Sequence, residues 1–304
     1  MISIVMTASD HLIRAIARDS HVRVATVLTT SLVAEAARGH QLSPAATVAL
    51  GRGLTAGLLL ATLTKGKERV TLQVLGNGPL GSITVDANGA GEVRGYVSHP
   101  TADLILPAGR QHIGELVGKK GVVSLLRDLG LKDLYQGQTA IVTGEVDEDV
   151  ENYLQISEQV PSALGCEVVL DQRGGVVVAA GVLVQAMPGS EPDSVAIAQG
   201  MLRGGRLYDL LVAGERSTRA LGEAIWGPGL EIVGDERLLR FQCHCTPERI
   251  ANLLAMLGTK ELDEMIAENK PAEVVCNYCS TKYRVEKPEL ERIRAVADKP
   301  REPN

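Results

Sequence analysis

Four of the five cysteines stand in two tight pairs near the end of the chain. Cys243 and Cys245 are separated by one residue, and Cys276 and Cys279 follow after thirty further residues, with two residues between them. Four thiolates in two clusters suit a tetrahedral Zn²⁺ site. The sequence therefore predicts one zinc ion held by these four cysteines.

The short spacing of the first pair raises two interpretations of this site. A disulfide across a single residue closes a strained ring, and strained disulfides are the easily reduced, regulatory kind. An oxidant that attacks the sulfurs would release zinc and let Cys243–Cys245 and Cys276–Cys279 close as two local disulfides. Neither bond would replace the long-range cross-link that a metal supplies, so the site would act as a redox switch. The alternative is a zinc site that only stabilises the fold.

The residues around the cysteines predict a small module. Thr246 and Pro247 are expected to cap and begin one helix between the pairs, and Thr259 to cap a second. His244 could compete for the metal, but four thiolates make a histidine ligand unnecessary. Cys166 lies in a strand-like stretch and is expected to be a buried apolar side chain. Four basic residues either offset the thiolate charge or form solvated surface: Arg240, Arg249, Lys282 and Arg284.

The composition of the 304 residues indicates a folded protein with an aliphatic core. The net charge of −6 and the aromatic content of 3% argue against a nucleic-acid partner, which needs basic patches and stacking rings. No export signal is recognised at the N-terminus, and the most apolar stretch, residues 53–64, is shorter than the ~20 residues that span a bilayer. We expect a cytoplasmic protein with no membrane association.

The elements that must position the cysteines predict an α+β fold. Helices are expected at residues 31–40, 44–64 and 147–160, and strands at 21–30, 70–76, 82–87, 92–97, 137–144, 166–172 and 176–187. Residues 1–189 would form an N-terminal α/β core domain with a mainly antiparallel sheet and packed helices. Glycine-broken helices over 190–235 would form a metastable linker, 236–287 a C-terminal zinc module, and 288–304 an exposed tail.

One motif imitates a nucleotide site. Residues 76–81 match the spacing G-x-G-x-x-G, but Pro79 interrupts the loop and an alternating strand pattern follows, where a dinucleotide site needs a helix. A glycine-rich turn is therefore predicted. No histidine has a spacing that ties it to a nucleophile, and we expect no enzymatic activity.

Several motifs together give the chain a family resemblance. It resembles the 33 kDa chaperonin family of redox-regulated heat-shock chaperones over almost its whole length. The resemblance rests on the cysteine pattern and on "TPERI…LLAMLG", "CNYC…Y", "GNGPLG", "VRGYV", "NYLQISEQVPS" and "LVQAMPG". The cysteine pattern is the most specific of these features.

The resemblance implies a chaperone that works without ATP. Such a protein binds unfolding clients under oxidative and heat stress, is idle when reduced and zinc-bound, and is activated when the linker unfolds. It also implies a homodimer in the active state and the transfer of clients to ATP-driven foldases. The alternative function is a zinc-ribbon-type nucleic-acid-binding protein, which the seven acidic and five basic residues of 243–286 oppose. A dithiol oxidoreductase is also opposed, because Cys276 and Cys279 lie in a hairpin context rather than at a helix N-terminus.

Overall fold

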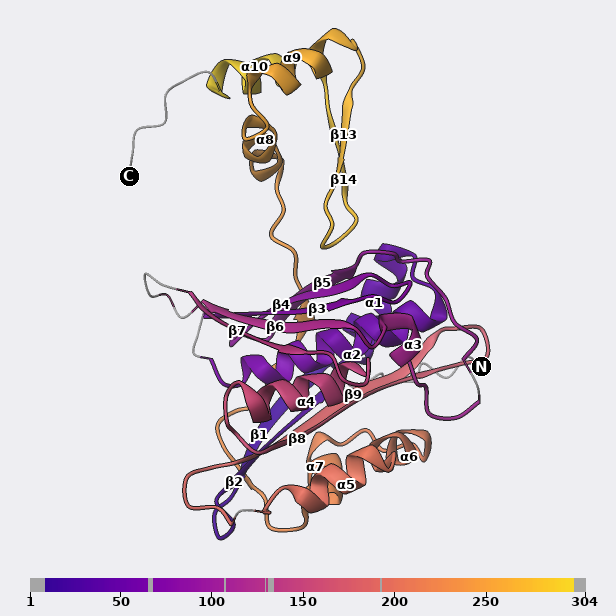
Figure 1. Ribbon diagram of the computed structural model, residues 1–304, viewed down its shortest axis with the longest axis vertical. Helices are drawn as coiled ribbons and strands as arrows, with labels where there is room; N and C mark the ends of the chain where they lie inside the picture. Colours follow the sequence, from indigo (N-terminus) through magenta and orange to yellow (C-terminus); the bar gives the residue numbers. More distant parts are fainter. Residues whose placement is uncertain are drawn as a thin grey trace. The chain divides into compact units, whose positions relative to one another are not determined.

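The computed structural model describes residues 9–64, 68–106, 108–128, 130, 134–191 and 193–297 (Figure 1). The chain divides into two compact units between Gln242 and Cys243. The N-terminal unit holds two six-stranded sheets, and the C-terminal unit one hairpin with helices. The predicted α+β class is confirmed, with the antiparallel strands sorted into two sheets.

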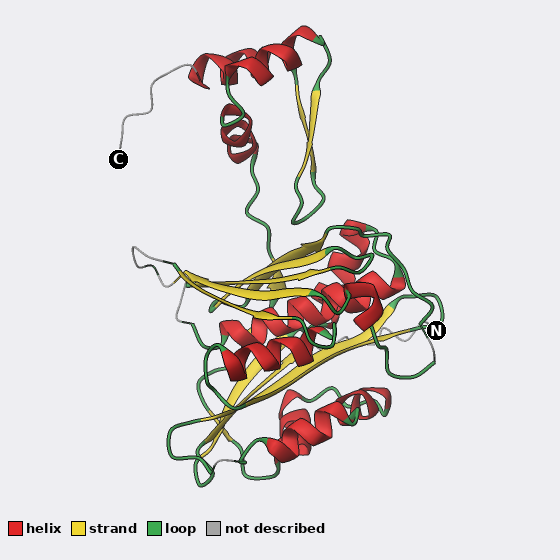
Figure 2. Ribbon diagram, in the orientation of Figure 1, coloured by secondary structure: helices red, strands yellow, loops and turns green. Residues whose placement is uncertain are grey.

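The N-terminal unit is built in layers of sheet and helix (Figures 1 and 2). Sheet A has the strand order β10-β1-β2-β9-β8, with β11 also paired to β1, and sheet B has the order β12-β5-β4-β3-β6-β7. Helices α2 (Pro44–Ala61) and α4 (Val146–Ile156) lie between the sheets, and α5 (Ala196–Arg203), α6 (Arg206–Val212) and α7 (Thr218–Trp226) lie on the other face of sheet A. The strands of sheet A are β1 (His11–Ala17), β2 (Val22–Leu28), β8 (Ser162–Leu170), β9 (Val176–Ala186), β10 (Glu231–Ile232) and β11 (Arg237–Leu238). Those of sheet B are β3 (Arg69–Gly76), β4 (Ser82–Asn88), β5 (Glu92–Val97), β6 (Gly121–Asp128), β7 (Tyr135–Ala140) and β12 (Arg240–Phe241).

Helix α2 (Pro44–Ala61) forms the centre of the core. Ser43 caps it by accepting a hydrogen bond from Ala46 N, and Pro44 occupies the first turn, as the sequence predicted. The helix is apolar nearly all round and long enough to cross a membrane, but 94% of it is buried inside the protein. It packs between the sheets beside the shorter helices α1 (Thr30–His40) and α3 (Gly114–Val117). This burial explains its composition without a membrane.

A network of buried charges ties α4 (Val146–Ile156) to the core. The Arg52 guanidinium, 1% exposed, donates to Glu145 at 2.6 Å and to Glu167 at 2.9 Å. Burial alone would lower the pKa of Arg52, but the carboxylates of Glu167, Asp147 and Glu145 outweigh it and raise that pKa. Removing either sign of charge would leave the other buried and uncompensated, which costs about 3–5 kcal/mol.

Helices α5 (Ala196–Arg203), α6 (Arg206–Val212) and α7 (Thr218–Trp226), the linker helices, cover an apolar face of sheet A. Leu202, Leu211 and Ile225 are buried against valines and alanines of β1, β2, β8 and β9. Trp226, the single tryptophan of the chain, packs against the same cluster at the end of α7. The helices break at Gly204–Gly205 and at residues 227–229, where the sequence predicted breaks.

Polar contacts also hold α5 to the body of the unit. Arg203 Nη2 donates to Glu151 Oε1 at 2.5 Å, and Gln199 Nε2 donates to the Ser162 carbonyl at 2.8 Å. Arg110 Nη1 donates to the Arg203 carbonyl at 2.8 Å. Because the Glu151 side chain is 4% exposed while that of Arg203 is 59% exposed, a buried carboxylate anchors a surface arginine.

The C-terminal unit has a small core of its own. Its elements are α8 (Pro247–Ala255), α9 (Thr259–Ala267), β13 (Ala272–Val275), β14 (Lys282–Val285) and α10 (Lys287–Ala297). The buried apolar side chains are Ile250, Leu254, Leu262, Val285, Leu290 and Ile293. A unit of this size with so few buried side chains needs a further source of stability, such as a metal.

The structure differs from the sequence-based expectation at several boundaries. Strands β1 and β6 were not predicted. Residues 231–241, expected to span the linker and zinc module, form short strands that pair with β1 and β5. Helix α10 lies where one exposed helix before a frayed tail was expected, but it is not fully exposed: it packs Leu290 and Ile293 into the C-terminal core. Gly258 rather than Thr259 holds the N-cap position of α9. The turn at residues 76–81 is as predicted: it joins β3 to β4 and opens no helix.

Candidate metal centre

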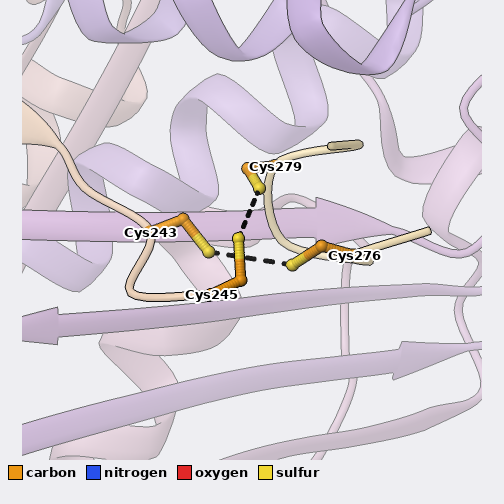
Figure 3. Close-up of side chains that lie close together, drawn as sticks. All are labelled: Cys243, Cys245, Cys276 and Cys279. Carbon is orange, nitrogen blue, oxygen red and sulfur yellow. Dashed lines mark hydrogen bonds between the residues drawn. The ribbon is translucent and has the colours of Figure 1, made fainter. Parts of the chain in front are cut away.

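The four clustered cysteines converge on one point in the C-terminal unit (Figure 3). All four Sγ atoms lie within 4.8 Å of one another. Cys243 Sγ lies 3.7 Å from Cys276 Sγ, and Cys245 Sγ lies 3.3 Å from Cys279 Sγ. The shortest contacts therefore join sulfurs from different segments of the chain.

Local backbone structure presents each pair of cysteines. Cys243 follows Gln242, whose N–H donates to the Val93 carbonyl at 2.8 Å. Thr246 then caps α8 by accepting a hydrogen bond from Arg249 N, as predicted. The second pair lies in the turn that joins β13 to β14, beyond the last residue pair of the hairpin, Val275 and Lys282.

A positive φ shapes the hairpin turn. Ser280 has a φ of 56°, and its N–H donates to the Cys276 carbonyl at 2.8 Å. Cys276 N–H in turn donates to the Thr281 carbonyl at 2.9 Å. These bonds fold the chain back on itself, so that Cys276 and Cys279 point toward the first pair.

The thiols of the cluster ionise at different pH values. Burial opposes ionisation of Cys279, but hydrogen bonds from Thr281 and the neighbouring thiols outweigh it and lower the pKa to about 7. Burial raises the pKa of Cys276 to about 12. Burial also raises the pKa of Cys245. Without a metal, Cys279 is therefore the readily ionised thiol beside the protonated thiols of Cys245 and Cys276.

The donor set fits zinc. Four sulfurs that each bond one Zn²⁺ at about 2.3 Å in a tetrahedron lie roughly 3.8 Å from one another. The observed separations, 3.3 and 3.7 Å for the two close contacts and no more than 4.8 Å for any pair, need only small shifts to reach this value. When bound, zinc would supply a cross-link between the two segments and keep all four thiols ionised.

Tyr283 is a neighbour of the cluster for which the sequence indicated no role. Its hydroxyl donates to Cys245 Sγ at 3.1 Å. This hydrogen bond is the main reason that the pKa of Tyr283 rises to about 12. Tyr283 and Cys245 are 38 residues apart along the chain, and only the fold of the C-terminal unit brings them together.

Other residues near the cysteines take structural positions. Cys166 is fully buried in β8, as predicted, and burial raises the pKa of its thiol well above the usual value. The His244 carbonyl accepts a hydrogen bond from Arg249 Nη1 at 2.9 Å. Arg240 pairs with Glu92 at 2.6 Å, and Arg284 with Glu286 at 2.8 Å. Arg240 and Arg284, two of the four basic residues near the cysteines in sequence, therefore form ion pairs with carboxylates.

Comparisons with known proteins identify the family. The family model described as Hsp33 protein matches residues 10–286. The chain belongs to the Hsp33 family. The 33 kDa chaperonin of Geobacillus sp. (strain WCH70) is 36% identical over 291 residues, covering 95% of this chain and 99% of that protein. The 33 kDa chaperonin of Synechococcus sp. (strain JA-3-3Ab) is 42% identical over 289 residues, covering 94% and 90%.

Solved Hsp33 structures agree with this assignment. A crystal structure of the 33 kDa chaperonin from Thermotoga maritima matches with a TM-score of 0.82 and 34% identity, covering 94% of this chain and 98% of that one. Membership of the Hsp33 family supports a chaperone role. The relatives are named as chaperonins and not as enzymes, which fits the expectation of a protein without catalytic activity.

Proposed function

We propose that this protein is a redox-regulated chaperone that binds unfolding proteins without using ATP. In the reduced state, Cys243, Cys245, Cys276 and Cys279 hold one Zn²⁺ and the chaperone is idle. Oxidation converts the four ligands to disulfides, the C-terminal unit loses its cross-link, and the linker over residues 190–235 unfolds. The observation that carries this proposal is the convergence of four sulfurs within 4.8 Å of one another in a unit with a small core.

The chemistry of activation balances without a cofactor. Each disulfide forms from two zinc-bound thiolates, which give two electrons to the oxidant as the zinc–sulfur bonds break and Zn²⁺ leaves. Two equivalents of hydrogen peroxide, with four protons from solvent, therefore yield two disulfides and four molecules of water. The proposed bonds are Cys243–Cys245 and Cys276–Cys279. The closest sulfur contacts in the folded unit join the other partners, and opening of the unit would favour the local pairing, because sequence neighbours then meet most often.

The linker helices support a mechanism for exposing a client site. They cover a face of sheet A that is rich in valine and alanine, with Val24, Val182 and Val184 fully buried or nearly so. Release of α5, α6 and α7 would uncover this apolar face, and the helices would expose their own leucines. Large exposed apolar surfaces bind other apolar surfaces. Unfolded clients present such surfaces.

The remaining parts of the proposal concern partners and location. We infer a homodimer in the active state, transfer of clients to ATP-driven foldases, and a place in the cytoplasm, where reducing conditions keep the zinc site intact. No nucleic-acid or membrane partner is proposed. The zinc-ribbon alternative would require basic surface, and the arginines nearest the cysteines along the chain include two that pair with carboxylates.

The proposal is tested by light scattering from a thermally unfolding test protein. The chain is added either reduced and zinc-loaded, or after treatment with peroxide at elevated temperature. Zinc release and free thiols are counted in the same samples, and the disulfides are mapped by mass spectrometry. The expected result is suppressed aggregation by the oxidised protein alone, with the loss of one zinc and four thiols.

Two outcomes would contradict the proposal. If zinc leaves and aggregation continues unchanged, the site is a structural zinc site and the switch is absent. If mapping shows bonds that join the two cysteine pairs, the local disulfide assignment fails while the chaperone activity stands. A salt-dependent shift of DNA or RNA by the protein would favour the nucleic-acid alternative.

A further inference from the structure

Strand β7 (Tyr135–Ala140) lies at an edge of sheet B and pairs with β6 on one side. Ile141 N–H, which follows β7, donates to the Gly121 carbonyl at 3.0 Å. Hydrogen-bonded and non-hydrogen-bonded residue pairs alternate along an antiparallel ladder. The backbone groups of residues 135, 137 and 139 therefore face β6, and those of Gln136, Gln138 and Ala140 face away from it.

The outward backbone groups of β7 are open to a partner. Gln136, Gln138 and Ala140 are exposed. Within the part of the chain that the structure describes, no hydrogen bond is found on their outward N–H or C=O groups. The Gln136 side chain is turned toward the sheet, where its Nε2 donates to Ser124 Oγ at 3.2 Å. The edge is thus a row of free backbone donors and acceptors.

Two kinds of protection are found at other edges of the N-terminal unit and not at β7. At the β8 edge, Leu164 N donates to Glu151 and Cys166 N to Asp147, so buried carboxylates accept hydrogen bonds from two of the outward N–H groups. The edge strands β10, β11 and β12 contain two residues each. Short length and charge are common protections of natural sheet edges.

The composition of β7 also lacks the usual protections. Residues 134–144 contain no charged residue and no proline. Exposed apolar side chains flank the strand: Leu134 is 57% exposed and Val142 is 60% exposed. An uncharged edge with apolar residues at its ends favours pairing with another extended, uncharged chain.

We propose that β7 binds an extended segment of an unfolded client as an added strand of sheet B. This inference rests on the proposed chaperone function and specifies one of its client contacts. A chaperone meets clients of unrelated sequence, and the backbone N–H and C=O groups are the recognition elements that all of them share. An added strand is bound through hydrogen bonds to those backbone groups. The exposed apolar side chains of Leu134 and Val142 favour uncharged segments of the client. The apolar face beneath the linker helices supplies further affinity when those helices leave.

Proline at position 138 tests the proposal. Gln138→Pro removes an outward N–H without removing a bond to β6, which is the position where an edge strand tolerates proline. Gln138→Ala keeps the N–H and serves as the matched control. Affinity for reduced and carboxymethylated lactalbumin is measured with both variants and the wild type after peroxide activation. Losing one backbone hydrogen bond predicts about three- to tenfold weaker binding by the proline variant and no change in the control.

Hydrogen exchange supplies a second, independent measurement on the wild type. Client binding should slow exchange at the amides of Gln136, Gln138 and Ala140, while the amides of residues 137 and 139 are already protected by β6. Equal affinities of the proline and alanine variants, with unchanged exchange at the three outward amides, would overturn the proposal. A wild-type chain that binds no client after activation would instead overturn the chaperone mechanism itself. Thermal unfolding of each variant shows whether a loss of binding comes from a loss of fold.

Discussion

At the scale of single residues, the cysteine cluster combines thiols of unequal acidity. Cys279 has a pKa lowered to about 7, whereas the pKa of Cys276 is raised to about 12. The two thiols are three positions apart in sequence, so their difference arises from the hairpin turn and not from composition. Such a difference directs an electrophile to one sulfur first, because the thiolate is the reactive form.

This difference predicts a selective reaction in the zinc-free reduced protein. At pH 7, about half of Cys279 is thiolate, and its alkylation by iodoacetamide should be several-fold faster than that of Cys276. The rate should fall as the pH drops below 7, because the thiolate becomes protonated. Mass spectrometry after timed labelling measures both rates. Thr281→Val should slow the alkylation of Cys279, because it removes the hydrogen bond between the Thr281 hydroxyl and the Cys279 sulfur. Equal alkylation rates at Cys276 and Cys279 in the wild type would contradict the prediction.

A second prediction concerns Tyr283. Tyr283→Phe removes the hydrogen bond to Cys245 Sγ and retains the ring that packs against the C-terminal core. Hydrogen bonds to metal ligands typically affect affinity by 10–100-fold. We expect about tenfold weaker zinc binding, measured by competition with a chromophoric chelator. Tyr208→Phe in the linker is the control, and an unchanged zinc affinity would show that the hydroxyl does not support the site.

At the scale of elements, α5 is attached by a contact between a buried and an exposed residue. Arg203 reaches Glu151 from the surface, and burial raises the pKa of Glu151. The helix is short and ends at two glycines, so these contacts contribute to its position as much as helix propensity does. Weakening the contact should therefore loosen the linker before it affects the core.

Arg203→Ala tests this view of the linker. The substitution should destabilise docking of α5 by about 1–2 kcal/mol, a value reduced by the exposure of the arginine. Hydrogen exchange in α5 should accelerate, and activation by peroxide should occur at a lower temperature. Because the pKa of Glu151 is raised, protonation at lower pH removes the uncompensated charge, and the difference from the wild type should shrink. Arg219→Ala, which removes an exposed pair with Glu223 within α7, is the control.

At the scale of the whole molecule, the two units differ in how they are stabilised. The N-terminal unit has a continuous apolar core around α2, while the core of the C-terminal unit consists of six buried side chains. The chain crosses from one unit to the other directly before Cys243. We therefore expect the smaller unit to depend on the proposed metal site for its stability, and the larger one not to.

Removal of the metal should destabilise the C-terminal unit without changing the stability of the N-terminal unit. A strong chelator under reducing conditions should unfold the C-terminal unit and leave the unfolding transition of the N-terminal unit in place. Limited proteolysis should then cut within residues 243–297, and circular dichroism should show the loss of α8, α9 and α10. Zinc added back should restore protection. A chelated protein that still resists cleavage in this segment would contradict the assignment of zinc as its main stabiliser.

The parts of the fold that could be predicted from the sequence are those that depend on residues close together in the chain. The caps at Ser43 and Thr246, the meander of β3, β4 and β5, and the glycine breaks of the linker follow from nearby residues. Convergence of the four cysteines was expected from their spacing. Strands β10, β11 and β12 could not be predicted, because two-residue strands exist only through partners that are distant in sequence. The contact of Tyr283 with Cys245 depends on the same kind of long-range folding.

The place of the single tryptophan has a practical consequence. Trp226 ends α7 and packs against the cluster that holds the linker to sheet A. Its fluorescence therefore reports on the linker, without any label and without interference from a second indole. Release of α7 should shift the emission to longer wavelength as water reaches the ring, and a stopped-flow trace of this shift after mixing with peroxide would time the opening of the linker. Recording zinc release in the same mixture would then give the order in which metal loss and linker opening occur.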